Sequence, residues 1–164
     1  MTRPSTLPSG GRYLGPDEYA ALVKDMEQIL QSSHLFKSLD EAGRAEILSL
    51  GYVQSFEAGG VIMTQGEAGK VMYLVMNGRV KVETETPGGT LHLAELGRGA
   101  CVGEVSVLTG GPRTATVKAV DAVDAVGLAA HRGERVLGAY PKVREVLEGL
   151  VESRAKDTIA KMLD

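Results

Sequence analysis

The sequence predicts a mainly β domain of antiparallel strands with helices at both ends, and three observations support this fold class. Between residues 51 and 130, short runs rich in Val, Leu, Met, Thr and Tyr alternate with turns that contain glycine. The 164 residues include 21 glycines, which indicates many tight turns. Apolar residues recur at helical spacing only before residue 51 and after residue 130. This pattern predicts an antiparallel sandwich or an eight-stranded jelly-roll barrel with flanking helices.

The first part of the chain is expected to be an arm followed by helices. Residues 1–15 are rich in Pro and Gly, show no apolar periodicity, and predict a flexible arm. Pro16 precedes two acidic residues, which is typical of a helix start, and apolar residues continue at helical spacing to Leu30. A second helix is expected over about residues 40–50. Residues 16–50 therefore predict an N-terminal helical segment, whose apolar face would pack on its own domain or dock on a partner.

Residues 51–130 are expected to form the barrel. Asn77-Gly78 lies between two apolar runs and predicts a β-hairpin, because both residues tolerate a positive φ. We expect the eight strands near residues 52–56, 61–65, 71–76, 79–85, 90–96, 100–102, 115–120 and 124–128.

Residues 131–164 return to helical composition. A short helix is expected over 131–139, and Pro141 can start a longer one. Its apolar stripe would pack on the domain or form a homodimer seam, and its mixed spacing does not distinguish these alternatives. If residue 164 ends the protein, no DNA-reading helix-turn-helix, kinase, channel or cyclase follows.

Charge and hydropathy argue against two classes of partner. The net charge is −3 and both signs are interspersed, so no basic stripe predicts binding to nucleic acid. No apolar stretch approaches the roughly 18 residues of a membrane span, and no signal-peptide region is apparent, so no membrane partner is expected.

The reactive side chains also argue against several chemistries. A single cysteine, Cys101, excludes a disulfide within the chain and indicates a reducing cytoplasm; we expect it to be a buried strand residue. His34, His92 and His131 lie far apart in the sequence and match no metal-binding spacing, so no metal is expected. Without a nucleophile elbow or a P-loop, the sequence predicts no enzymatic activity.

The stretch from Gly103 to Val117 carries the clearest chemical pattern. It begins with Gly-Glu, and Arg113 follows a Gly-Gly-Pro corner nine residues after Glu104. This arrangement suits a small anion that carries a sugar. Free N–H groups at a helical turn and an arginine fork bind negative charge, and a carboxylate accepts from sugar hydroxyls. The alternative is a surface salt bridge between Glu104 and Arg113, typically worth under ~1 kcal/mol.

The same stretch resembles the phosphate-binding cassette of cyclic-nucleotide-binding domains, the family of the bacterial catabolite activator and the protein kinase A regulatory subunit. The family pattern is F-G-E-[LIV]-[AS]-L, a short turn, then P-R-x-A; this chain has V-G-E-V-S-V, L-T-G-G and P-R-T-A. Val102 stands where an aromatic residue is usual, and we expect a packing adjustment. The resemblance spans about residues 34–150, including the turn over 65–69. It implies a jelly roll with C-terminal hinge and lid helices.

The resemblance also implies roles for the cassette residues. Gly103 would let the backbone approach the sugar, and Glu104 would accept from the ribose 2′-hydroxyl. Backbone N–H groups around Val105 and Ser106 would meet the cyclic phosphate, whose exocyclic oxygens Arg113 would bind. The predicted ligand-binding residues are Gly103, Glu104, Val105, Ser106, Arg113, Thr114 and Ala115.

The purine site is less visible in the sequence. Thr114 follows the arginine. In the family that the cassette resembles, a hydroxyl at this position is often linked to tolerance of guanine, so cGMP is an alternative ligand, although cAMP is favoured. The candidate base contacts are Val80, Val82 and Leu91 from the barrel and Leu150, Val151 or Arg154 from the last helix.

These expectations define a stand-alone, cytoplasmic cyclic-nucleotide receptor that is not an enzyme and uses cAMP or cGMP as a regulatory ligand. Ligand binding would change the packing of Val107 against the helices after residue 131, which would swing toward the barrel and signal to a protein effector. The rival is a nucleotide-independent scaffold that keeps the fold, and the intact Glu104 and Arg113 argue against it. A transcription regulator would require a DNA-binding segment.

Overall fold

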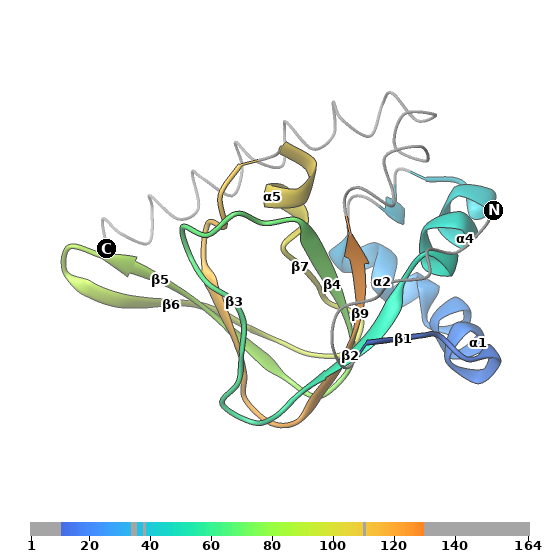
Figure 1. Cartoon of the computed structure of the whole chain (residues 1–164), viewed down its shortest axis with the longest axis horizontal. Helices are drawn as coiled ribbons and strands as arrows, with labels where there is room; N and C mark the ends of the chain where they lie inside the picture. Colours follow the sequence, from blue (N-terminus) through green and yellow to red (C-terminus); the bar gives the residue numbers. More distant parts are fainter. Residues whose placement is uncertain (1–10, 34–35, 38, 110, 130–164) are drawn as a thin grey trace.

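The computed structural model describes residues 11–33, 36–37, 39–109 and 111–129, which fold into two antiparallel sheets with helices on one side (Figure 1). One sheet has the strand order β1-β2-β9-β4-β7 and the other β3-β8-β5-β6. The predicted mainly β, jelly-roll-type architecture is confirmed, although the two sheets do not close into one continuous barrel. The predicted C-terminal helices lie outside the described residues.

The eight predicted strands are confirmed, with ends within two residues of their expected bounds, and one further strand, β1, precedes them. The strands are β1 (Arg12–Tyr13), β2 (Tyr52–Phe56), β3 (Val61–Met63), β4 (Val71–Asn77), β5 (Val80–Thr86), β6 (Gly89–Leu96), β7 (Cys101–Val102), β8 (Thr116–Ala119) and β9 (Val123–Ala129). The helices are α1 (Pro16–Lys24), α2 (Met26–Ser32), α4 (Glu41–Ser49) and α5 (Glu104–Thr109). The helix expected from Pro16 is divided into α1 and α2 at Asp25.

Strand β1 lies inside the predicted flexible arm, so that prediction is wrong for its last residues. Tyr13 pairs with Tyr52 of β2, which ties the chain to the sheet before α1 begins. The Arg12 guanidinium donates to the Glu18 carboxylate over 2.7 Å (Nη2 to Oε2), and Gly15 N donates to Glu18 Oε1 over 2.9 Å. These two contacts lower the pKa of Glu18 to about 2. The start of α1 is thus fixed by one carboxylate.

The turn at Asn77-Gly78 does not form the predicted β-hairpin. Strand β4 pairs with β7 and β9, whereas β5 pairs with β6 and β8, so the chain passes from one sheet to the other at this corner. Only Gly78 has a positive φ, +87°, and Asn77 does not adopt the conformation that a type I′ turn requires. Arg79 N donates to Asp121 Oδ1 over 2.7 Å, which holds the corner against the passage from β8 to β9. Tertiary partners therefore override the local turn signal.

Strand β4 separates two apolar cores because its side chains alternate between its faces. Met72 and Leu74 belong to the helix-side core, between the first sheet and the N-terminal helices. Tyr73 and Val75 belong to the inter-sheet core, between the two sheets. The Tyr73 ring meets Phe56 edge-on at a centroid distance of 5.6 Å. This alternation fixes the register of β4 and, through it, the position of β7 at the sheet edge.

We predict that Gly78→Ala destabilises the fold far more than Gly66→Ala. Both glycines have φ +87°, so both substitutions carry the same left-handed strain, about 1 kcal/mol. A Cβ at Gly78 would lie 2.3 Å from the carbonyl oxygen of Ala122, whereas a Cβ at Gly66 would have nothing within 4 Å. The extra overpacking cost at the corner should be about 1–3 kcal/mol. Thermal unfolding of both variants measures the difference, and equal melting temperatures would contradict the corner contact.

Candidate functional site

The cassette begins where β7 leaves the edge of the first sheet. Strand β7 pairs with β4, the chain turns at Gly103 with φ +80°, and α5 starts at Glu104. In Figure 1, α5 follows β7 directly, at the end of β4 opposite the sheet corner. Arg113 lies on the segment between α5 and β8. Its N–H donates to Glu67 O over 2.8 Å and its carbonyl accepts from Gly66 N over 2.9 Å, so its backbone is fixed to the turn that precedes β4.

The Arg113 side chain is buried, with 7% of its surface exposed, and it is held by neutral oxygens. Nη1 donates to Ser106 Oγ over 2.8 Å and to Gly103 O over 3.3 Å. Nη2 donates to Val71 O. The three acceptors are two carbonyls and one hydroxyl. Gly103 and Ser106 belong to one segment, and Val71 belongs to another, more than 30 residues earlier in the sequence.

Arg113 forms no ion pair with a carboxylate among the described residues. None of the ion pairs that this part of the chain forms within 4.0 Å includes Arg113. Burial lowers the pKa of the Arg113 guanidinium, and the neighbouring Tyr73 and Glu67 act in the opposite direction. A buried cation whose hydrogen bonds all go to neutral acceptors is costly, and a bound anion would offset that cost. The surroundings of Arg113 therefore favour an anionic ligand.

Two glycines make room for the arginine. A Cβ at Gly69 would lie 2.3 Å from Ser106 Oγ and 2.7 Å from Arg113 Cδ. A Cβ at Gly103 would lie 2.5 Å from Arg113 Nη1. We call Gly69, Val71, Gly103 and Ser106 the arginine cradle, because these four residues enclose the guanidinium.

Glu104 is completely buried and faces the N-terminal helices. Its Oε1 accepts from Ser33 Oγ over 3.2 Å, and the same hydroxyl accepts from Phe36 N over 3.2 Å. The alternative of a surface salt bridge between Glu104 and Arg113 is wrong, because both side chains are buried and no ion pair within the described residues joins them. The ribose contact of Glu104 remains a prediction.

The other predicted residues are distributed around the cradle. Val105 and Ser106 both lie in α5, and the Ser106 side chain is buried. Thr114 is exposed and Ala115 is half-buried on the approach to β8. Of the candidate base contacts, Val80 is fully buried in the inter-sheet core, whereas Val82 and Leu91 are half-buried. The candidate contacts Leu150, Val151 and Arg154 lie outside the described residues.

Sequence reasoning predicts Gly103 and Ser106 as site residues but misses Gly69 and Val71 of the cradle. For Ser106 the sequence predicts a role only for the backbone N–H and not for the hydroxyl, and it predicts Val71 only as a strand residue. A backbone carbonyl carries no sequence signature, so Val71 O could not have been found. Gly69 had a usable signal, because it ends the glycine-bearing turn that the resemblance includes.

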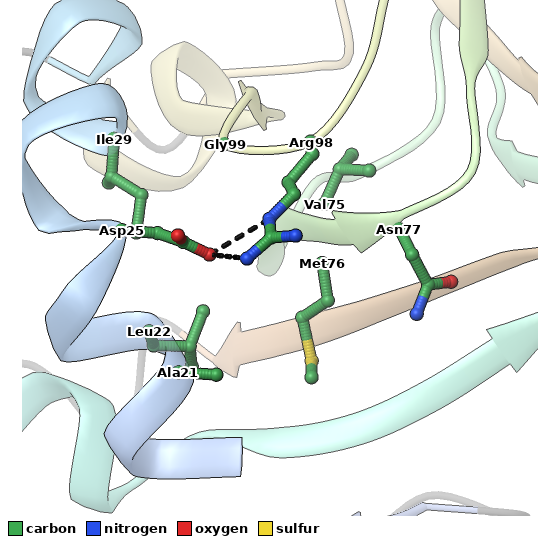
Figure 2. Close-up of a pocket in the computed structure, with 9 residues that line it drawn as sticks. All are labelled: Ala21, Leu22, Asp25, Ile29, Val75, Met76, Asn77, Arg98 and Gly99. Atoms are coloured by element: carbon green, nitrogen blue, oxygen red, sulfur yellow. Dashed lines mark hydrogen bonds and ion pairs between the residues drawn. The ribbon is translucent and has the colours of Figure 1, made fainter.

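A separate cavity of about 200 Å³ lies between the helix pair α1–α2 and β4 (Figure 2). Leu22, Ile29 and Met76 contribute apolar walls. Asp25 and Arg98 form an ion pair at its side, with Arg98 Nε 2.9 Å from Asp25 Oδ2. None of the predicted cassette residues lines this cavity.

The described residues contain neither a membrane-spanning helix nor a metal-binding cluster. Within these ranges no helix has the length and apolar character needed to cross a bilayer. The same residues bring together no group of three His, Cys, Asp or Glu side chains that could hold a metal ion.

We predict that Gly69→Ala destabilises the protein by about 1–3 kcal/mol, because its methyl group would overlap Ser106 and Arg113. Gly88→Ala is the matched control. Neither glycine has a positive φ, and the only atom near a Cβ at Gly88 would be Thr86 Oγ1 at 3.8 Å. Removing a glycine from this open turn should change stability by less than about 1 kcal/mol. Urea unfolding compares the two, and a Gly69→Ala midpoint as high as that of Gly88→Ala would contradict the cradle.

The chain is similar to known proteins over most of its length. The cyclic nucleotide-binding domain family model matches residues 53–140. A cAMP-dependent protein kinase regulatory subunit from Mycosarcoma maydis is 32% identical over 133 residues, covering 80% of this chain and 25% of that protein. A cyclic nucleotide-gated potassium channel from Rhizobium etli is 32% identical over 120 residues, covering 73% of this chain and 32% of the channel. The chain thus spans a quarter to a third of the length of these relatives.

Solved structures give the same result. The regulatory domain of Toxoplasma gondii PKA in complex with cAMP has a TM-score of 0.69 and 25% identity, covering 79% of this chain and 48% of that chain. The Thermus thermophilus catabolite activator protein has a TM-score of 0.66 and 29% identity, covering 79% and 62%. Since the family model matches more than half of the sequence, this chain belongs to the cyclic nucleotide-binding domain family.

Proposed function

We propose that this chain is a receptor for a cyclic nucleotide, with cAMP favoured over cGMP, and that it has no enzymatic activity of its own. One observation carries the proposal: the buried Arg113 guanidinium is held by neutral oxygens in the cassette that the family uses for phosphate. The phosphate of a cyclic nucleotide carries one negative charge, which would balance the one buried positive charge. The cAMP complex of a solved relative supports this ligand class.

In the proposed complex, Arg113 binds the exocyclic phosphate oxygens and the sugar lies against Gly103. Glu104 accepts from the ribose 2′-hydroxyl, and this contact exchanges with its hydrogen bond to Ser33. Thr114, which follows Arg113 and is exposed, is assigned to the purine in this proposal. A ligand shifts the conformation only by its different affinity for the two arrangements of these side chains.

The proposed output is a movement of the C-terminal helices, predicted over residues 131–164, toward a protein effector. Val107, which would transmit the change, is half-buried and packs against the helix-side core. Regulatory subunits and a channel among the relatives support a signalling role. A homodimer through the last helix is a further arrangement that this proposal allows. A coupling of about 1–3 kcal/mol between ligand and effector would be typical.

We predict that Arg113→Ala weakens cAMP binding at least tenfold, because a charge-assisted pair with phosphate is lost. Arg113→Lys should fall between this variant and the wild type, since lysine keeps the charge but not the planar fork. Arg79→Ala is the control: Arg79 is exposed and its Nε donates to Glu95 Oε1 over 2.8 Å, outside the cassette. Titration calorimetry with cAMP and with cGMP measures the affinities, and thermal unfolding verifies that each variant is folded.

Two results would overturn the proposal. Absence of binding heat from the wild type with both nucleotides would favour the nucleotide-independent scaffold. Unchanged affinity of Arg113→Ala would place the phosphate elsewhere.

A further inference from the structure

We propose that the side-chain hydroxyl of Ser106 is a positioning group. It holds the Arg113 guanidinium in one orientation relative to the two exocyclic oxygens of the ligand phosphate. This inference rests on the proposed function and extends it. The hydroxyl, rather than the backbone N–H of the same residue, decides how the arginine presents its remaining donors. The inference therefore concerns how strongly and how selectively the phosphate is bound.

The first step is a donor inventory. A guanidinium has five N–H donors, of which two are on Nη1, two on Nη2 and one on Nε. Within the described residues, Nη1 donates to Ser106 Oγ and Gly103 O, and Nη2 donates to Val71 O. Two donors are then left for a ligand, one on Nη2 and one on Nε. This number matches bidentate binding of one phosphate.

The second step concerns the direction of the hydroxyl. A serine hydroxyl has one donor and two acceptor lone pairs. Ser106 Oγ lies 3.2 Å from Gly103 O, to which its only proton can be donated. An oxygen that has donated its proton there presents its lone pairs to Arg113, whose Nη1 is 2.8 Å away. Because Ser106 is only 3% exposed, water does not easily replace it as the acceptor.

The third step is the rigidity of the cradle. Ser106 Oγ holds Nη1 while Val71 O holds Nη2, and two contacts at different nitrogens fix the plane of the guanidinium. The space is closely limited, because a Cβ at Gly69 would reach both Ser106 Oγ and Arg113 Nε, at 2.3 and 2.8 Å. With Ser106 removed, Nη1 would keep only the 3.3 Å contact to Gly103 O, and the guanidinium would be free to turn.

A fixed guanidinium should distinguish the two exocyclic oxygens of a cyclic phosphate. Replacing one of them with sulfur gives the Sp and Rp phosphorothioates of cAMP, which differ only in which position accepts hydrogen bonds poorly. An arginine held in one orientation binds the two diastereomers with different affinities. An arginine that turns freely discriminates less. The ratio of the two affinities therefore reports on positioning, and a general loss of stability would not change it.

The experiment compares Ser106→Ala, Ser106→Cys and Ser106→Thr with the wild type by calorimetry, using cAMP and both phosphorothioates. We expect Ser106→Ala to weaken cAMP binding about tenfold and to shift the Sp-to-Rp ratio toward one. Ser106→Cys nearly keeps the volume of serine but has a weak acceptor, so it should weaken binding and shift the ratio as Ser106→Ala does. It provides the test if the smaller alanine side chain impairs folding. Ser106→Thr keeps the hydroxyl and should restore the ratio. Ser55→Ala, which removes an exposed hydroxyl bonded to Asp124, is the control.

A second measurement needs no nucleotide. In ¹⁵N NMR spectra of the full chain, rotation of the Arg113 guanidinium should be slow in the wild type and faster in Ser106→Ala and Ser106→Cys. If the wild type binds no cyclic nucleotide, the proposed function fails, and these spectra still test whether Ser106 holds the arginine. Unchanged guanidinium signals, or a Ser106→Ala variant that weakens both phosphorothioates equally, would overturn the positioning role.

Discussion

A guanidinium buried among neutral oxygens is the interaction on which the rest of this site depends. Removing a charge from water is expensive, and carbonyl and hydroxyl dipoles repay only part of that cost. Arg113 remains buried because its own N–H and carbonyl are bonded to Glu67 and Gly66, so the side chain has little freedom to reach solvent. The site thus holds a buried positive charge at a fixed place, without an ion-pair partner among the described residues, which suits the recognition of a small anion.

The topology of the sheets is what brings the acceptors together. Val71 begins β4, and Gly103 follows β7. Because Tyr73 of β4 pairs with Val102 of β7, Val71 and Gly103 lie side by side. A slip of one residue in this register would turn Tyr73 and Val75 out of the inter-sheet core. The register that fills the core is therefore the same register that assembles the cradle, so stability and ligand recognition depend on one alignment.

The sequence predicts the elements of this fold well and their tertiary partners poorly. Alternating apolar residues and glycine-bearing turns give the strands from β2 to β9, because period and turn chemistry are local properties. Asn77-Gly78 has a strong hairpin signal, yet contacts with Asp121 and Ala122, more than 40 residues away, decide its conformation. Arg113 was found through its motif, whereas the hydrogen bond from Ser33 to Glu104 spans 71 residues and has no local signature.

Ligand binding at this site should exchange a hydrogen bond at Glu104 and add hydrogen bonds at Arg113. The side chains expected to meet the nucleotide already have protein partners: Glu104 accepts from Ser33, and Arg113 donates to the cradle. For a contact that replaces a protein partner, as at Glu104, only the difference between the new and the old interaction contributes to affinity. The cradle does not use all N–H donors of Arg113, so the phosphate adds hydrogen bonds to the remaining donors and replaces none. The phosphate should accordingly supply most of the affinity, and the sugar contact should instead couple ligand binding to the helices that carry Ser33.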